Sequence, residues 1–514
     1  MPSTTGGAEP GAQRGTIGKV WLVGAGPGDP GLLTLKGARA LAQCDVLVYD
    51  YLASEAIVAL APPDCEKIYV GKRAGRHTLT QDEITALIVR LGRDGKRVVR
   101  LKGGDVFVFA RGGEEAHALA EAGVPFEIVP GITSAIAAPA YAGIPVTHRD
   151  HNTSFTIATG HEDPTKGYSS LDFAKLANPK ATTIFLMAMG NLAGIVAQLR
   201  AHGLPDATPV GIVHEGTKPT QEVVTATLAT VVDEVARTGI SAPAIVVIGD
   251  VVKERERIRW FDAQPLFGKR VLVTRPAHQA DDFAQQLWEA GATPILAPTI
   301  AIGPPPDAAA AREAVSRVRD YAWVVFTSRN GVDAFFDLLG ELGRDARAFG
   351  DAKVAAIGPK TAAALTARGI RVDLVPQTYV NEAVAGALLE HTRPGDRVLV
   401  FRAHQAREVL PETLYQAGRA VDVVAGYATR AVDDPQLAEK AERADVVTFT
   451  SSSTVKGFLD NVPHGARMLV TKTVACIGPI TAQTAREAGI RVDVVADEFT
   501  VEGLMQALRT AASS

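Results

Sequence analysis

A glycine-rich turn, GAGPGDPGLLT at 24–34, follows an apolar run and is the first segment whose residues could do chemistry. Glycines let a ligand approach the backbone closely. A dinucleotide-binding fingerprint would need a third glycine where Asp29 stands, and a P-loop would need a closing Gly-Lys-Ser/Thr that this turn lacks. Pro27 and Pro30 make the turn rigid. The turn therefore predicts either a ligand contact or a structural corner, with both alternatives open.

The segment RLKGGDVFVFARGGEE at 100–115 brackets a strand-like run with two glycine pairs. Gly103 and Gly104 permit close backbone approach at a strand end, which is where open α/β sheets bind ligands. Asp105 follows them and is suited to hold a ribose hydroxyl or an ammonium group. A solvated loop is the alternative interpretation.

A third segment, VPGITSAIAAPAYAGIPVTHRD at 129–150, opens with Gly131, Thr133 and Ser134. These residue types are typical of a turn that leads into a helix N-cap. The segment therefore predicts either a ligand-binding turn or a plain helix cap.

Alternating strands and helices must position these segments. Apolar runs without strict alternation are typical of strands covered on both faces, which predicts an α/β fold. The pattern pauses at 251–268, where charged residues give way to Pro and Gly, and a fresh strand begins at Lys269. We place the main domain boundary near residue 260. The clearest strand-like runs are 19–26, 45–50, 97–104, 182–188 and 244–250.

The composition of the 514 residues is that of a globular protein, with 46% apolar and 21% charged residues. A net charge of −4 argues against a general nucleic-acid binder. Cys44, Cys65 and Cys476 have neither metal-ligand nor disulfide spacing, which favours a reducing compartment and predicts no metal site. The small polar residues 1–16 predict a disordered tail, and 132–146 is too short and proline-broken to span a membrane.

The C-terminal half contains an internal repeat. Val271 recurs as Val398, an offset of 127 positions, and Thr361 recurs as Thr481, an offset of 120. Such duplication predicts two similar α/β lobes. We call 271–298 and 398–426 the two A segments, and 324–375 and 447–495 the two B segments, so the chain runs A, B, A, B. The first A segment could share a lobe with the first B segment or, in a swapped arrangement, with the second B segment. The matching segments are 271–298 with 398–426, 324–335 with 447–458, and 355–375 with 475–495.

The N-terminal motifs resemble, in order, those of uroporphyrinogen-III C-methyltransferases over about 17–255. The motifs are GAGPGDPGLLTLKG, YDYLAS, GKRAG, LKGGD, RGGEEA, PGITSA, AYAGIPVTHRD, TGH and HEGT. The first is shared by all tetrapyrrole methylases, whereas RGGEEA with AYAGIPVTHRD is typical of the uroporphyrinogen enzyme. The resemblance implies a two-lobed α/β fold with S-adenosyl-L-methionine in the cleft between the lobes.

The resemblance also implies roles for individual residues. The proton acceptor would be Asp50 and the proton donor Lys72. Val106 and Ala110 depart from the family pattern, as does Ala188. The tetrapyrrole would be held by Arg111, which we count with the catalytic residues, and by Glu114, Arg149 and His161. The cofactor would be bound by Pro27, Gly103, Gly104, Asp105, Val108, Thr133, Ser134, Met187 and Gly216.

The implied chemistry fits these residue types. A reduced pyrrole carbon can attack a sulfonium methyl directly, so catalysis is mostly alignment. A proton must then leave the macrocycle, and Asp50, at the end of a strand, could accept it, although a turn or helix-cap role is the alternative. The eight carboxylates of the substrate need cations. Candidates are Lys72, Arg73 and Arg76, with Arg111 and Arg149 as planar forks.

The C-terminal half resembles uroporphyrinogen-III synthases over about 268–510, through VLVTRP, FTSRNGV, IGPKTA, GYATR and IGPITA. That family joins two lobes by a two-strand ladder, which implies the swapped pairing, with one lobe of 268–300 plus 428–512 and the other of 301–427. The implied reaction closes hydroxymethylbilane while inverting its last ring, a step that needs steering more than catalytic groups.

In this family a tyrosine matching Tyr427 assists departure of the hydroxyl group. Thr361 and Thr481 match substrate-contact positions, although from the residues alone they are plain helix caps. Candidate carboxylate partners are Arg275, Arg329, Lys360, Arg402 and Arg430.

These observations predict a cytoplasmic, bifunctional enzyme of tetrapyrrole biosynthesis that makes precorrin-2 for sirohaem or cobalamin and binds neither nucleic acid nor membrane. The methyltransferase half resembles proteins that form homodimers. Two alternatives remain: the N-terminal half could methylate a later precorrin, or the C-terminal half could be a non-catalytic tetrapyrrole sensor. The expected order is a tail (1–16), the methyltransferase (17–255), a linker (256–267) and the synthase (268–512).

Overall fold

The computed structural model describes residues 17–71, 79–161 and 170–513. The chain divides into two compact units. The first holds the chain up to Lys269 together with Ala290–Thr293, and the second holds Arg270–Glu289 and Pro294–Ser514. The tail predicted for 1–16 lies outside the described residues. Within the described ranges, no helix is long and apolar enough to cross a membrane.

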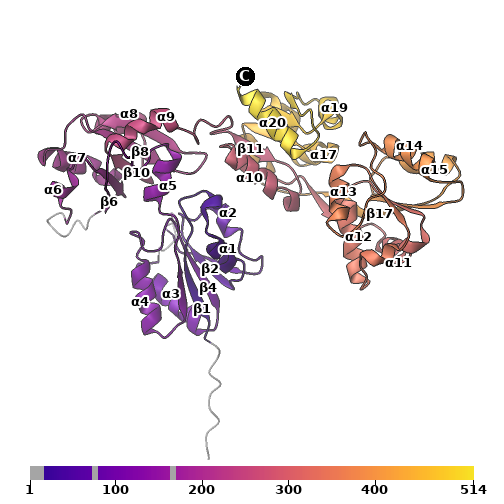
Figure 1. Cartoon of the computed structure of the whole chain (residues 1–514), viewed down its shortest axis with the longest axis horizontal. Coiled ribbons are helices and arrows are strands. Elements are labelled where there is room, and N and C mark those ends of the chain that lie inside the picture. Colours follow the sequence, from indigo (N-terminus) through magenta and orange to yellow (C-terminus); the bar gives the residue numbers. More distant parts are fainter. Residues whose placement is uncertain (1–16, 72–78, 162–169, 514) are drawn as a thin grey trace, which may run out of the picture. The chain divides into compact units, whose positions relative to one another are not determined.

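The first lobe of the first unit is a parallel five-stranded sheet in the order β3-β2-β4-β1-β5. Trp21 and Val23 of β1 pack on one face with α1 and α2, while Val20 and Leu22 pack on the other with α3 and α4 (Figure 1). Burial on both faces explains why β1 and β2 read as continuous apolar runs. The strands are β1 (Lys19–Gly24), β2 (Val46–Tyr49), β3 (Glu66–Tyr69), β4 (Arg97–Lys102) and β5 (Phe126–Val129), and the helices are α1 (Leu35–Leu41), α2 (Glu55–Val58), α3 (Gln81–Arg93) and α4 (Gly112–Glu121).

The second lobe is a mixed sheet in the order β6-β7-β10-β8-β9, in which only the β6–β7 pair is parallel. Its core on one face is closed by α5, and on the other by α6, α7 and α8. The strands are β6 (Phe155–Thr159), β7 (Thr182–Leu186), β8 (Pro209–His214), β9 (Glu222–Thr227) and β10 (Ala244–Ile248), and the helices are α5 (Ser134–Tyr141), α6 (Phe173–Leu176), α7 (Leu192–Ala201) and α8 (Val231–Thr238).

The segment 256–267 differs from the linker that its composition predicts. It begins within α9 (Arg255–Ile258), which directly follows η3 (Asp250–Glu254), and it packs against the end of α5. The Trp260 Nε1 donates to the carbonyl of Ala140 at 3.0 Å. Phe261 is only 2% exposed, with its ring centroid 4.8 Å from that of Tyr141. Because Phe261 is buried there, the segment is part of the first unit.

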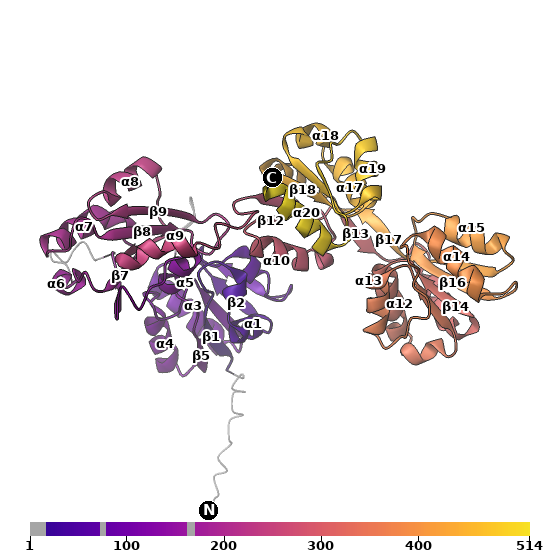
Figure 2. The same ribbon diagram turned by 45° about the horizontal axis from the view of Figure 1, so that its top comes forward.

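The second unit confirms the swapped repeat. One sheet, β12-β11-β18-β19-β20, pairs the first A segment with the second B segment, and the other, β13-β17-β16-β14-β15, pairs the second A with the first B. The lobes are joined where β13 pairs antiparallel with the end of the long strand β17, from Ile300 opposite Ala431 to Gly303 opposite Ala428 (Figure 2). The strands are β11 (Arg270–Val273), β12 (Thr293–Leu296), β13 (Ile300–Gly303), β14 (Trp323–Phe326), β15 (Lys353–Ala356), β16 (Arg397–Ala403), β17 (Ala420–Ala431), β18 (Val446–Phe449), β19 (Thr473–Cys476) and β20 (Val494–Val495).

Helices pack against both sheets of this unit. In the first sheet, α16, α17 and α19 close one core. In the other, α11, α12 and α13 close one core, and α14 and α15 close the opposite one. The helices are α10 (Asp281–Glu289), α11 (Ala308–Ser316), α12 (Arg329–Glu341), α13 (Pro359–Thr366), α14 (Asn381–His391), α15 (Val409–Gln416), α16 (Leu437–Arg443), α17 (Ser452–Asn461), α18 (Gly465–Met468), α19 (Pro479–Glu487) and α20 (Val501–Ser513).

Candidate functional site

A cavity of about 510 Å³ lies between the two lobes of the first unit, where β1, β2 and β4 end. Its size is that of small-molecule sites in proteins, and its position is where parallel sheets bind ligands. It gathers most of the residues that the N-terminal motifs single out. Those lining it are Pro27, Asp50, Gly103, Gly104, Asp105, Val108, Arg111, Thr133, Ser134, Met187 and Gly216.

Three backbone segments meet so closely at this cavity that only glycine fits. A Cβ on Gly131 would lie 2.2 Å from the carbonyl oxygen of Gly104, and one on Gly24 would lie 2.5 Å from the Cα of Gly131. Gly104 also has a φ of +69°, and its N–H donates to the carbonyl of Gly26 at 2.8 Å. Each of Gly24, Gly104 and Gly131 lies in a different motif, and their close approach leaves no room for a side chain on Gly24 or Gly131.

The Asp105 carboxylate organises this loop. One oxygen accepts from the N–H groups of Phe107 at 2.8 Å and Val108 at 3.1 Å, and the other accepts from that of Gly131 at 3.1 Å. Such charge-assisted bonds are stronger than neutral ones. The sequence predicts that Asp105 contacts a ligand, whereas its contacts in this structure are to the backbone.

The turn at 24–34 is a corner that also reaches the cavity. The Tyr141 hydroxyl donates to the Asp29 carboxylate at 2.6 Å, and the Asp29 N–H donates to Oγ1 of Thr217 at 3.1 Å. Burial, followed by the bond to Asp29, raises the pKa of Tyr141, so its hydroxyl remains a donor at neutral pH. These bonds join the two lobes, while Pro27 lines the cavity.

A buried charged network, which sequence reasoning missed, lies beside the cavity. Glu115 is fully buried, and its Oε1 accepts from Lys102 at 2.9 Å and from Nε of Arg100 at 3.3 Å. Arg100 also donates to Asp50 at 3.2 Å. Burial, and next the charge of Arg100, lowers the pKa of Lys102, while Glu115 opposes that shift. The Oε2 of Glu115 is buried without a hydrogen-bond partner.

The signal for this network was present in the sequence. Arg100 and Lys102 are two residues apart in an apolar strand, so both side chains point to the same face. Both line the cavity. Two bases on one buried face need a carboxylate partner, because an unpaired buried charge is costly.

The backbone around the cavity is unusually strained. Non-glycine residues rarely adopt positive φ, and such residues cluster at functional sites. Six described non-glycine residues have positive φ, and four of them line this cavity: Phe109, Arg111, Met187 and Glu215, at +53°, +58°, +54° and +45°. This concentration supports a functional role for the cavity independently of any motif.

Other predicted residues lie outside this group. Glu114 is exposed and pairs with Arg111 at 2.6 Å. Arg149 and His161 are exposed and are not among the residues that line the cavity. The predicted donor Lys72, with Arg73 and Arg76, lies outside the described residues.

In the second unit, Tyr427 lies where β17 leaves its pairing with β16. Its side chain is 7% exposed, and its hydroxyl is 2.9 Å from Oγ of Ser328, the N-cap of α12. Burial raises the pKa of Tyr427, while the bonds to Ser328 and Asn330 oppose the shift. The hydroxyl is therefore protonated at neutral pH and can donate a hydrogen bond.

A chain of polar contacts leads from Tyr427 to the other lobe. Nε2 of Gln279 donates to Asn330 at 2.7 Å, and Arg275 donates to Gln279 at 3.3 Å. The Nε of Arg275 is buried without a partner. Burial lowers the pKa of Arg275, although not enough to make a guanidinium neutral at pH 7. Arg275 is thus an under-satisfied cation near Tyr427, as a carboxylate site requires.

The duplicated threonines are not helix caps. The N-caps of α13 and α19 are Gly358 and Gly478, neither of which has a side-chain cap bond. Thr361 and Thr481 are buried in the first turns of these helices, 4% and 5% exposed. An exposed aromatic ring lies beside each turn, Tyr379 over Gly358 and Phe499 over Gly478. This extends the repeat to a pair of residues that sequence reasoning missed.

The remaining candidate cations of this unit differ in their surroundings. Arg402 is 7% exposed and donates to the carbonyl of Arg407, which is a structural role. Lys360 pairs with Glu502 at 3.4 Å. Arg329 pairs with Asp333 at 3.6 Å, and Arg430 is exposed and packs beside Gly303.

Comparison with known proteins divides the chain in the same way. The profile of the tetrapyrrole (corrin/porphyrin) methylases matches residues 19–232. The profile of uroporphyrinogen-III synthase HemD matches residues 281–506. The two profiles thus cover the first and second units separately.

Individual proteins are similar to one or both halves. A porphyrin biosynthesis protein HemD from Ruminiclostridium josui is 38% identical over 497 residues, which is 96% of this chain and 97% of that protein. A uroporphyrinogen-III C-methyltransferase from Bacillus subtilis is 41% identical over 370 residues, 72% of this chain and 76% of that protein. An S-adenosyl-L-methionine-dependent uroporphyrinogen III methyltransferase from Methanosarcina barkeri is 51% identical over 238 residues, 46% of this chain and 93% of that protein.

Proposed function

We propose a reaction sequence for this chain, which belongs to the family of porphyrin biosynthesis proteins that join a tetrapyrrole methylase to a uroporphyrinogen-III synthase. Its N-terminal half is an S-adenosyl-L-methionine-dependent uroporphyrinogen-III C-methyltransferase, and its C-terminal half is a uroporphyrinogen-III synthase. The C-terminal half closes hydroxymethylbilane to uroporphyrinogen III. The N-terminal half then adds two methyl groups, giving precorrin-2 for sirohaem or cobalamin.

One observation carries the methyltransferase part of this proposal: a single cavity brings together Asp50, the glycine loop, Arg111 and Met187. The cavity, at about 510 Å³, has the size of sites that hold small molecules. S-adenosyl-L-methionine supplies a methyl group on a sulfonium when bound. The cavity residues align that group with the substrate carbon, and alignment is most of the catalysis that this reaction needs.

Asp50 is the residue that we assign to accept the proton that leaves the macrocycle. It lines the cavity, and its Oδ2 accepts from Arg100 at 3.2 Å. Arg100 is held in turn by Glu115, so the network fixes the direction of the Asp50 carboxylate. Arg100 is thus a positioning residue. Lys72 keeps the role of proton donor only as an implication of the family resemblance.

Arg111 is the cation that we assign to a substrate carboxylate. Its guanidinium pairs with the exposed carboxylate of Glu114, and its backbone is held at a φ of +58°. An exposed pair of this kind is weak and can be exchanged for a substrate carboxylate. Arg149 and His161 would contact the parts of the macrocycle that extend beyond the cavity.

In the synthase half, Tyr427 donates a hydrogen bond to the departing hydroxyl group of hydroxymethylbilane. Its raised pKa keeps it protonated for this role. Arg275 binds a substrate carboxylate from the facing lobe, where its unpartnered Nε gains an acceptor. The first turns of α13 and α19, which contain Thr361 and Thr481, offer backbone N–H groups to further carboxylates.

Two variants of the full chain test this division of labour. Asp50→Asn should stop methylation of uroporphyrinogen III but leave conversion of hydroxymethylbilane to the rearranged isomer. Tyr427→Phe should slow only the closure of hydroxymethylbilane and leave methylation of supplied uroporphyrinogen III unchanged. Each variant is the control for the other, because both keep the whole chain. Loss of both activities in either variant would contradict independent sites, and unchanged cyclisation in Tyr427→Phe would favour a sensing role for the C-terminal half.

The setting of the enzyme is part of the same proposal. We assign it to the cytoplasm and propose a homodimer that forms through the methyltransferase half. Light scattering of the full chain and of a chain cut between the units would test the dimer. A monomeric full chain would contradict it.

A further inference from the structure

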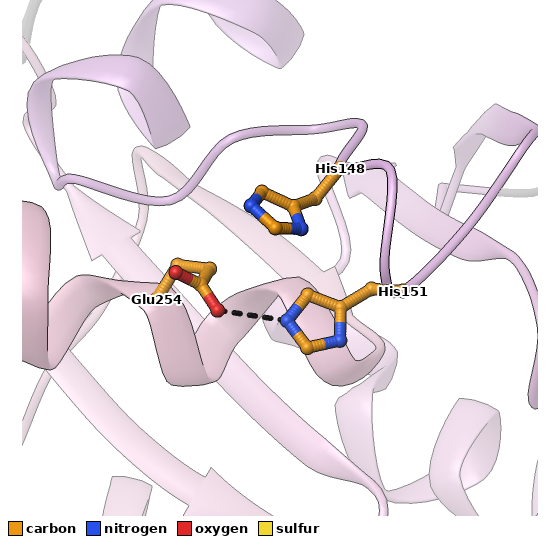
Figure 3. Close-up of side chains that lie close together, drawn as sticks. All are labelled: His148, His151 and Glu254. Carbon is orange, nitrogen blue, oxygen red and sulfur yellow. Dashed lines mark hydrogen bonds and ion pairs between the residues drawn. The ribbon is translucent and has the colours of Figure 1, made fainter.

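Two histidines and a glutamate lie together outside the cavity of the first unit. His148 and His151 are in the loop between α5 and β6, and Glu254 ends η3 (Figure 3). Nε2 of His151 is 2.8 Å from Oε1 of Glu254, and the two imidazole rings are 4.9 Å apart. One ligand atom from each residue lies within 4.8 Å of the others. None of the three residues lines the cavity of the first unit.

The loop that carries the histidines is held in place by a buried side chain. Asn152 is 8% exposed, and its Oδ1 accepts from the His148 N–H at 2.8 Å. Its amide donates to the carbonyl of Ser154 at 2.9 Å and to Oγ1 of Thr182 at 3.0 Å. Because Thr182 begins the core strand β7, the turn is anchored to the sheet. The two imidazoles are therefore positioned before any ligand arrives.

The three side chains are partly sheltered from solvent. Their side chains are 35% (His148), 21% (His151) and 14% (Glu254) exposed. The backbone N–H of Asp150 donates to Nδ1 of His148 at 3.3 Å and so orients this ring.

We infer that His148, His151 and Glu254 form a binding site for a divalent transition metal, of which zinc is the best fit. Two imidazoles and one carboxylate, with water in the fourth position, are a known zinc ligand set. Donors around a tetrahedral zinc ion are separated by about 3.3–3.5 Å at metal–ligand distances of about 2.0–2.2 Å. To bind the ion, Nε2 of His151 and Oε1 of Glu254 must move apart slightly from their present 2.8 Å. Any two ligand atoms that are now as much as 4.8 Å apart must approach each other by little more than 1 Å.

This site was not visible in the sequence. The cysteines predict no metal site, and the two histidines are three positions apart in a loop, which is a weak signal by itself. The third ligand is more than one hundred positions later, and it is the packing of η3 against the loop that supplies it. A bound metal would tie that loop, which also carries Arg149, to the end of the methyltransferase unit.

Cobalt and zinc titrations of the full chain test the inference. After treatment with a chelator, the protein should take up one equivalent of Co²⁺ with the visible absorption of a low-symmetry four-coordinate site, and Zn²⁺ should displace it. His151→Gln and Glu254→Gln should each weaken Zn²⁺ binding at least about tenfold, because each removes a ligand. Far-UV circular dichroism of both variants confirms that they fold.

The chain contains a matched control. His117 and Glu121 form an exposed pair on α4, with Nε2 and Oε1 3.0 Å apart, but offer only two ligands. His117→Gln should leave cobalt binding unchanged. Absence of the cobalt absorption in the parent chain would overturn the inference, as would equal binding by His151→Gln and the parent. Because this readout does not involve turnover, it is independent of the proposed methylation.

Discussion

Replacing Glu115 with glutamine tests whether the buried network stabilises the first unit. Glu115 is fully buried, and the side chains of its two partners are 4% (Arg100) and 5% (Lys102) exposed. Glu115→Gln keeps the shape but leaves Lys102 without a carboxylate partner and Arg100 with Asp50 alone. Removal of one partner from a buried ion pair costs about 3–5 kcal/mol. For a unit of this size each kcal/mol lowers the Tm by about 2–4 °C, so the first unit should unfold about 6–20 °C earlier.

The pH dependence of the variant gives a second, signed prediction. The folded-state pKa of Lys102 is already below its ordinary value of 10.5, and Glu115 is one of the groups that keep it from falling further. In the variant without Glu115, the folded-state pKa of Lys102 falls further. At pH values between that folded-state pKa and 10.5, Lys102 is protonated in the unfolded chain but neutral in the folded chain, so the unfolded chain binds more protons. Stability therefore rises with pH in that window. The deficit of the variant should shrink as pH rises toward 10.5.

Scanning calorimetry of the full chain measures both effects, since the two units can unfold separately. The adjacent residue provides the control: Glu114 pairs with Arg111 at the surface, with side chains 55% and 56% exposed. Such pairs contribute about 0–1 kcal/mol, so Glu114→Gln should lower the Tm by at most about 4 °C. Equal Tm values for the two variants would refute the reasoning. So would a deficit in Glu115→Gln that grows with pH.

Three further predictions concern the proposed reactions. Arg111→Ala should lower kcat/KM for uroporphyrinogen III about ten- to hundredfold, because it removes a charge-assisted contact to a carboxylate; wild-type turnover would contradict the assignment. Tyr427→Phe should slow formation of the rearranged isomer about tenfold, as expected for loss of one hydrogen bond, with product isomers separated by chromatography; an unaltered rate would exclude the hydroxyl from the reaction. Asp105→Asn places a side-chain amide N–H against the backbone N–H of Gly131, where the carboxylate now accepts a hydrogen bond. It should weaken binding of S-adenosyl-L-methionine about tenfold or more, as measured by titration calorimetry. Unchanged affinity would show that the loop does not need the carboxylate.

The fold was predictable where local signals repeat. Buried parallel strands give apolar runs, and the duplicated segments of the second half made two lobes expected. The swapped pairing came from the family resemblance, because nothing in the repeat itself decides which segments share a sheet. The ladder of β13 with β17 is the element that realises it.

The glycine motifs were predictable because they concern backbone geometry. Gly131 lies so close to the carbonyl oxygen of Gly104 that it leaves no room for a side chain, and glycine in a short motif already indicates such close backbone approach. The contacts missed are those that depend on how the elements pack. Asp29 and Tyr141 are 112 positions apart, and Glu115 is recognisable as a partner of Lys102 only once α4 packs on the sheet.

The segment 256–267 shows a different limit. Its charges and Pro265, with Gly268 directly after it, are typical of a linker, but Trp260 and Phe261 pack against α5. The composition of a segment does not indicate whether another part of the fold offers a surface on which the segment can pack. Two adjacent aromatic residues in a predicted linker are a signal for such docking.

The central claim is that one chain carries out both consecutive reactions. The most direct measurement supplies the full-length protein with hydroxymethylbilane and methyl-labelled S-adenosyl-L-methionine, with no other synthase, and identifies the products by mass spectrometry and isomer separation. We predict a tetrapyrrole of the rearranged isomer series that carries two labelled methyl groups. Accumulation of the unrearranged isomer alone, or of rearranged product without label, would contradict the claim.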